Sequence, residues 1–171
     1  MSDPTTIRRS QLTRQAEGYL ELGMPQHALS TLARLEMFTS LDSAAQYLRG
    51  EALRSLDRWE EALPWLRAAA SGDSENIHIW LALGWCYKRT GQLRRAIDAL
   101  ENGLEVDPSE AILHYNLACY WSLARNKEHA LDYLSQAFEI DPNYRDRVHD
   151  EADFDLLRND ADFQALTSVI V

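Results

Sequence analysis

The chain has 171 residues, an ordinary hydrophobic fraction and a net charge of −10, which together suit one domain with a continuous buried core. The negative charge argues against binding nucleic acid through general attraction to phosphates, and no run approaches the ~18 apolar residues that a membrane helix needs. The first residues lack a basic start followed by an apolar stretch. We therefore expect a cytoplasmic protein with no membrane span and no nucleic-acid partner.

One spacing organises the sequence. Alanines recur every 34 residues, each with a leucine four residues later: Ala28 and Leu32, Ala62 and Leu66, Ala96 and Leu100, and Ala130 and Leu134. A period of this length, carried by small and large apolar residues, is typical of stacked helical pairs. It predicts a flexible N-terminus at 1–8, four repeats at 9–42, 43–76, 77–110 and 111–144, and a capping segment at 145–171.

The first two repeats keep this register with some departures. The first has Gly23 where a helix end needs a backbone that turns freely, but the second has Asp57 at that place and Ser74 where a closing proline is expected. Pro64 falls inside the second helix predicted for repeat 43–76. Because proline lacks an N–H and crowds the preceding turn, we expect a kink or a late helix start there.

The third repeat has the clearest pattern. Trp80, Leu83, Gly84 and Tyr87 lie on one stripe of a predicted helix, and Gly91 follows it at the turn. The fourth repeat keeps the apolar register but has His114 where the tryptophan belongs and Arg125 where the glycine belongs.

The stretch WLALGWCYKRTGQLRRAIDALENGLEVDP resembles a tetratricopeptide repeat, through its Trp, Leu-Gly, Tyr, Gly, Ala and Pro positions. The other three units resemble it in the same register. The resemblance implies an all-α fold, a right-handed superhelical solenoid of antiparallel helix pairs. It also implies a non-catalytic module that binds a protein or peptide partner.

Residues 145–171 carry seven acids against three arginines, a local charge of −4. This segment resembles the tail that closes many bacterial tetratricopeptide arrays, and its predicted job is to cover the last apolar face. Asn159 or Asp160 is a plausible N-cap for its final helix.

No catalytic grouping emerges from the sequence. It has no glycine-rich phosphate loop, no nucleophile elbow and no His or Cys pair with metal-ligand spacing, so we expect no enzyme activity, no cofactor and no metal site. Cys86 and Cys119 are interpreted as small core residues rather than a disulfide.

In the tetratricopeptide family the first helix of each pair lines the concave groove. The resemblance implies that the partner-binding groove includes Tyr47, Glu51, Arg54, Leu81, Trp85, Lys88, Arg89, Tyr115, Asn116 and Cys119. The aromatic and apolar members form one strip and the basic members a patch beside it, so a segment with apolar and acidic residues would suit the groove. The alternative is that the tyrosines and Trp85 only pack against neighbouring helices.

A subgroup of the family clamps the C-terminal carboxylate of chaperones with lysine and asparagine on the first helix. Here Thr13 and Glu17 stand at those places, and a glutamate would repel a carboxylate. We therefore expect an adaptor or assembly factor of another kind. The alternatives are a dedicated chaperone that shields an aggregation-prone client, or self-association through the first helix or Val169–Val171, as a monomer or weak homo-oligomer.

Overall fold

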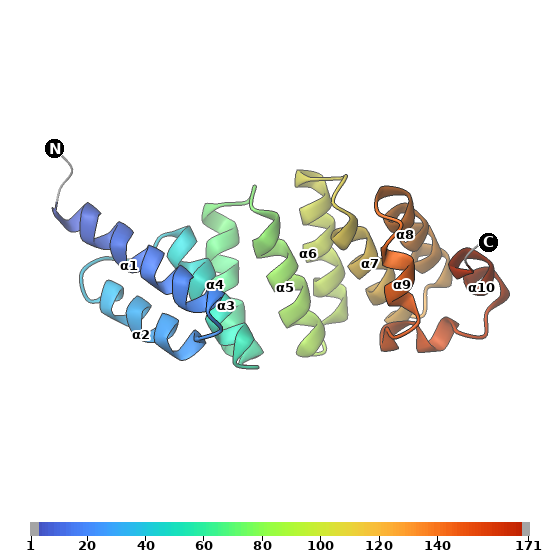
Figure 1. The fold of residues 1–171 in the computed structure, drawn as a ribbon, viewed down its shortest axis with the longest axis horizontal. Coiled ribbons are helices and arrows are strands. Elements are labelled where there is room, and N and C mark those ends of the chain that lie inside the picture. Colours follow the sequence, from blue (N-terminus) through green and yellow to red (C-terminus); the bar gives the residue numbers. More distant parts are fainter. Residues whose placement is uncertain (1–3, 169–171) are drawn as a thin grey trace. The chain divides into compact units, whose positions relative to one another are not determined.

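The computed structural model describes residues 4–168, and within that range it contains helices and connecting turns but no strand. Residues up to Gly91 form one compact unit, unit 1, and residues from Gln92 form another, unit 2. Unit 1 contains α1 (Pro4–Glu21), α2 (Pro25–Glu36), α3 (Ser43–Ser55), α4 (Trp59–Gly72) and α5 (Ile77–Arg89) (Figure 1). Unit 2 contains α6 (Leu93–Val106), α7 (Ala111–Leu123), α8 (Lys127–Ile140), α9 (Tyr144–Val148), the 3-10 helix η1 (Ala152–Leu157) and α10 (Ala161–Thr167).

The helices confirm the all-α fold and follow the predicted repeat frame. Each pair within a unit packs closely: α1 on α2, α3 on α4, and α7 on α8. The four alanines of the 34-residue period and their four leucines are all fully buried. Since full burial of a leucine contributes about 1.5–3 kcal/mol, this pattern accounts for much of the packing within each unit.

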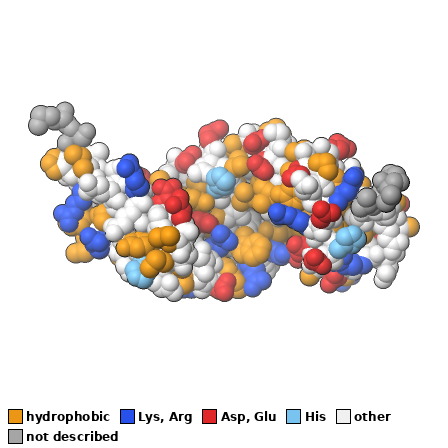
Figure 2. Space-filling model, viewed as in Figure 1, with side chains coloured by type: hydrophobic (Ala, Val, Ile, Leu, Met, Phe, Trp, Pro, Cys, Tyr) orange, Lys and Arg blue, Asp and Glu red, His pale blue; other side chains and the backbone are white. Residues whose placement is uncertain are grey.

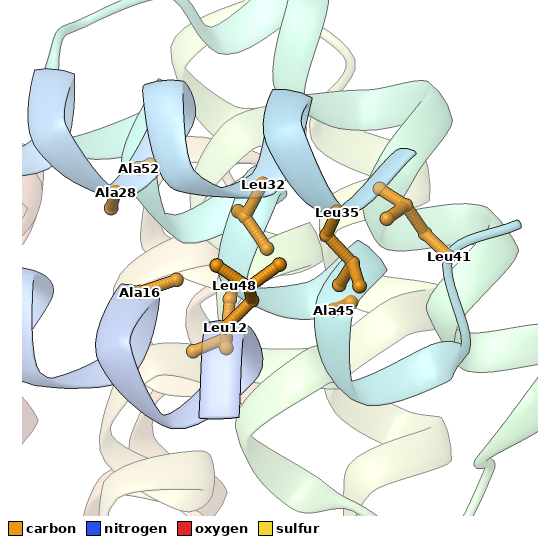
Figure 3. Packing of buried hydrophobic residues seen from close by; sticks show 9 residues of the cluster. All are labelled: Leu12, Ala16, Ala28, Leu32, Leu35, Leu41, Ala45, Leu48 and Ala52. Atoms are coloured by element: carbon orange, nitrogen blue, oxygen red, sulfur yellow. The ribbon is translucent and has the colours of Figure 1, made fainter. Parts of the chain in front are cut away.

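In unit 1, small residues bring the helices of a pair together. The core cluster joins leucines and alanines from α1, α2 and α3 (Figure 3). A Cβ placed on Gly50 would lie 2.5 Å from Cδ2 of Leu66, so α3 and α4 approach more closely there than a larger residue would allow. Gly50 is therefore required for the fit of Leu66.

The turn inside each repeat takes the same left-handed backbone, whether or not glycine is present. The φ angles are +68° at Gly23, +57° at Asp57, +73° at Gly91 and +59° at Arg125, and these residues lie 34 apart. At Asp57 and Arg125 the following residue donates to a carbonyl five residues back: Arg58 to Leu53, and Asn126 to Trp121. These bonds close the end of the preceding helix as in a Schellman motif, and so fix the turn without glycine.

The N-terminal boundary differs from the prediction. Residues 4–8, expected to be flexible, form the first turns of α1, which begins at Pro4. Proline suits a first helical position, because its missing N–H has no intrahelical partner there. The Arg8 guanidinium lies 4.1 Å from the Phe38 ring centroid, and Arg9 pairs with Asp42. Figure 2 shows basic and hydrophobic side chains together on this end of unit 1.

Pro64 lies inside α4, which already begins at Trp59, so the late helix start expected there does not occur. Cys86 and Cys119 are both free and buried, as predicted. None of the helices between residues 4 and 168 combines the length and hydropathy needed to cross a membrane.

The C-terminal segment packs on the last helix pair of unit 2. There η1 lies on α7, while α9 and α10 contact α8 (Figure 1). Asp160 is the N-cap of α10 and accepts hydrogen bonds from the backbone N–H groups of Asp162 and Phe163, which confirms one of the two predicted caps. Nζ of Lys127 lies 2.7 Å from a carboxylate oxygen of Asp160 and of Asp162, and so ties α8 to α10. Val169–Val171 lie outside the described residues.

Candidate partner-binding face

In unit 1 the first helices of three successive repeats, α1, α3 and α5, are neighbours in space. We call the side they share the first-helix face. Seven of the predicted groove residues belong to α3 and α5, at spacings of four and then three or four along a helix, which places them on one side of each helix. On α3 these residues are Tyr47, Glu51 and Arg54, and on α5 they are Leu81, Trp85, Lys88 and Arg89.

On α3, Arg54 and Glu51 form a bidentate ion pair. Nε and Nη2 of Arg54 lie 2.8 and 2.9 Å from the two carboxylate oxygens of Glu51. The hydrogen bond to Glu51 raises the pKa of Arg54, and burial raises the pKa of Tyr47 to about 12. Tyr47 therefore keeps its hydroxyl proton at neutral pH. It is half-buried and packs against the unit 1 core, so part of its role is structural.

On α5 the aromatic side chain faces water. Trp85 is 41% exposed, and Nζ of Lys88 lies 5.6 Å from its ring centroid. The exposed Arg89 stacks its guanidinium 4.2 Å from the ring centroid of Trp59 on α4. Large exposed aromatics beside cations are the residue types that dominate binding energy at interfaces. Trp85 therefore presents an exposed aromatic ring beside a cation on α5.

Cys86 lies next to Trp85 in the sequence but is fully buried. Burial raises the pKa of its thiol to about 12, so almost none of it is the nucleophilic thiolate at neutral pH. Among residues 4–168, no group of three His, Cys, Asp or Glu side chains is placed to hold a metal ion.

The three predicted groove residues of unit 2 have a different environment. Tyr115, Asn116 and Cys119 lie on α7, where Tyr115 is 5% exposed, Cys119 is 2% exposed and Asn116 is half-buried. The ring centroid of Tyr115 lies 4.8 Å from that of Tyr144 on α9 and 5.9 Å from that of Phe154 on η1. The chain's own C-terminal segment therefore covers this part of α7.

A hydrogen bond also holds the C-terminal segment against α7. Oγ of Ser122 on α7 donates to the backbone oxygen of Asp153, 2.7 Å away. The Tyr115 hydroxyl is buried without a hydrogen-bond partner, and burial raises its pKa. Tyr144 and Phe154 are residues that sequence reasoning did not assign to this face. The signal was present in α7, whose sequence AILHYNLACYWSL has no Asp, Glu, Lys or Arg, and a helix without a charged side is usually buried all round.

Helix pairs with a 34-residue period, and first helices that share one face, define a helical-repeat protein of the kind that serves as an interaction module. Two family models, both described as tetratricopeptide repeat, match residues 13–77 and 53–118 and together run from residue 13 to residue 118. The chain belongs to the tetratricopeptide repeat family. Members of this family are generally non-catalytic modules for protein–protein interaction.

Individual relatives are distant. The general transcriptional corepressor ssn6 of Schizosaccharomyces pombe is 29% identical over 94 residues, which is 54% of this chain and 8% of that protein. The chain therefore spans less than a tenth of that relative's length. MamA from Desulfovibrio magneticus RS-1 has a TM-score of 0.74 at 21% identity, covering 79% of this chain and 76% of its own. YrrB, a TPR protein with an unusual peptide-binding site, has a TM-score of 0.72 at 24% identity, covering 79% of this chain and 70% of its own. At these identities the structural likeness shows the fold.

Proposed function

We propose that the chain binds a peptide or protein segment on the first-helix face of unit 1 and thereby acts as an adaptor or assembly factor. The observation that carries this proposal is the exposure of Trp85 beside Lys88 on α5. Leu81 lies one helical turn before Trp85 on the same side of α5, so an apolar side chain of a partner has two neighbouring surfaces to contact.

Physical chemistry supports a binding role for this tryptophan. A large ring left in water contributes little to stability, whereas its burial by a partner contributes both apolar contact and an orienting indole N–H. The peptide-binding site reported for YrrB, a protein of the same fold, is consistent with this use of the repeats.

The experiment is affinity capture from native cells, followed by mapping of the captured segment and isothermal titration with that purified segment. Trp85→Ala should weaken its binding by more than about tenfold, since tryptophans at interfaces commonly contribute 2 kcal/mol or more. Phe38→Ala is the matched control, because Phe38 is 50% exposed in the same unit and follows α2 rather than lying on a first helix. Equal affinities for the wild type and Trp85→Ala would exclude this face as the binding site.

A further inference from the structure

In unit 2, the side of α7 that carries the predicted groove residue Tyr115 is occupied by residues 144–158 of the same chain, which we call the strap. The strap consists of α9, η1 and the residues beside them. Phe154 of η1 is fully buried, with its ring centroid 5.9 Å from that of Tyr115 and 5.5 Å from that of Phe163 on α10. The ring centroid of Tyr144 on α9 lies 4.8 Å from that of Tyr115. The strap therefore covers Tyr115 with two aromatic side chains.

Hydrogen bonds within the strap hold it together as one piece. Nη1 of Arg158 donates to the backbone oxygen of Val148 at 3.1 Å, and Nη2 donates to that of Glu151 at 2.9 Å. The helix that follows the strap, α10, is tied separately to α8 by the ion pairs of Lys127. Because α7 also packs closely on α8, the strap can leave α7 while this helix pair stays packed.

The fit of the strap on α7 leaves a polar group of Tyr115 unsatisfied. Tyr115 is 5% exposed, and its hydroxyl has no hydrogen-bond partner. Burial raises the pKa of this hydroxyl and the charge of Glu151 raises it further, so the hydroxyl lies close to the strap. A buried hydroxyl that loses water and gains no partner weakens an interface by about fivefold or more. The strap is therefore a weaker ligand for α7 than a segment that offers this hydroxyl an acceptor.

The contacts of the strap also indicate what kind of segment would replace it. Oγ of Ser122 on α7 donates to the backbone oxygen of Asp153, so the residue before Phe154 is bound through its main chain. Any peptide has such a main-chain acceptor. Since α7 has no Asp, Glu, Lys or Arg, a replacing segment needs no charge for this helix. Its required features are an aromatic side chain in the place of Phe154 and an acceptor for the Tyr115 hydroxyl.

We propose that the strap is a displaceable cover, and that the side of α7 beneath it is a second binding site, for a segment of another protein with those two features. The site lies in unit 2, so the inference does not depend on the proposed function of unit 1. The cover makes binding selective. A segment that only repeats the contacts of Phe154 cannot displace a strap that is tethered to the same chain at a high effective concentration.

The first test measures how tightly the strap is closed in the full chain. Tyr115→Phe removes the unsatisfied hydroxyl and keeps the ring, so hydrogen exchange of the η1 backbone amides, followed by NMR, should slow by about fivefold or more. Leu156→Ala is the matched control, because Leu156 is 55% exposed on η1 and its truncation should leave exchange nearly unchanged. Unchanged or faster exchange in Tyr115→Phe would mean that the hydroxyl has a partner in the closed state, and would overturn the proposal.

The second test uses a fluorescein-labelled peptide with the sequence of residues 144–158 and fluorescence anisotropy. Phe154→Ala in the full chain should free the site and allow the peptide to bind, whereas the wild type and Leu156→Ala should bind it at least about tenfold more weakly. In the Phe154→Ala chain, adding Ser122→Ala should weaken binding and adding Trp85→Ala should not. No binding to Phe154→Ala, equal binding to the wild type, or dependence on Trp85 would each overturn the proposal.

The third test selects peptides that displace the strap from the wild-type chain. The probe is a phage-displayed library of peptides of the same length as the strap, with phenylalanine fixed at the place of Phe154. Selected peptides that still bind Trp85→Ala should compete with the labelled peptide and should bind Tyr115→Phe at least about fivefold more weakly. Equal affinity for Tyr115→Phe would refute the role of the hydroxyl. A wild-type dimer in light scattering that Phe154→Ala converts to a monomer would instead assign the site to the strap of a second copy.

Discussion

Arg125 occupies the turn between α7 and α8 with a φ of 59°. Of the three equivalent residues in the other repeats, which also have positive φ angles, two are glycines, Gly23 and Gly91. The left-handed region costs an L-residue about 1–2 kcal/mol, and the greater freedom of glycine in the unfolded chain offsets about 0.5–1 kcal/mol of any gain. We therefore expect Arg125→Gly to raise the free energy of unfolding by about 0.5–1 kcal/mol.

The reverse substitution is Gly91→Ala. A Cβ on Gly91 would meet no atom within 4 Å, so its effect is conformational rather than steric. With φ at 73°, the same two terms act in reverse, so Gly91→Ala should lower the free energy of unfolding by about 0.5–1 kcal/mol.

The assay is urea unfolding followed by circular dichroism, with Arg125→Ala as the control that removes the charge but keeps a Cβ. For a chain of this size each kcal/mol also shifts the melting temperature by roughly 2–4 °C. A destabilised Arg125→Gly, or an equal gain from Arg125→Ala, would show that backbone conformation is not what this position contributes.

Three further predictions test the packing, the cap and the buried thiols. Gly50→Ala should destabilise unit 1 by about 1–3 kcal/mol in urea unfolding, because the new methyl group overlaps Leu66, and truncating Leu66 in the same chain should give a less than additive loss. Asp160→Asn should lower the melting temperature at neutral pH, because the hydrogen bond from Lys127 holds the pKa of the Asp160 carboxyl below its usual value. That stabilisation is complete above the unfolded pKa of about 4 and is lost as pH falls through the folded pKa, so melting curves of the wild type and the variant should converge in acid. Both cysteines are buried and should react with a thiol reagent such as DTNB only after unfolding; rapid reaction of the native chain would contradict their burial.

The helices could be predicted from the sequence because the same spacing of small and large apolar residues recurs in each repeat. The alanines and leucines of the 34-residue period indicate which side of each helix is buried, and all eight of them are buried as expected. The departures at Asp57 and Arg125 did not alter the turns, because hydrogen bonds from Arg58 and Asn126 hold the backbone there. The start of α1 was missed because residues 4–8 lie outside the repeat.

The candidate site was predicted less completely, for a physical reason. A repeat register tells which side of a helix lies away from its partner helix, but it does not tell what else covers that side. Tyr115 has the register of a groove residue, yet its ring packs against Tyr144 and Phe154 of the C-terminal segment and is almost fully buried. The degree of exposure of Trp85 likewise depends on its neighbours and not on its position in the repeat.

The central claim is that a partner segment binds the first-helix face of unit 1 at Trp85. The most direct measurement is the indole N–H region of an ¹⁵N NMR spectrum, with the Trp85 signal assigned by its loss in Trp85→Phe and the captured segment titrated in. The Trp85 signal should shift in a saturable manner, while that of Trp121 on α7, in unit 2, stays in place. Saturable binding that leaves the Trp85 signal unmoved would contradict the account.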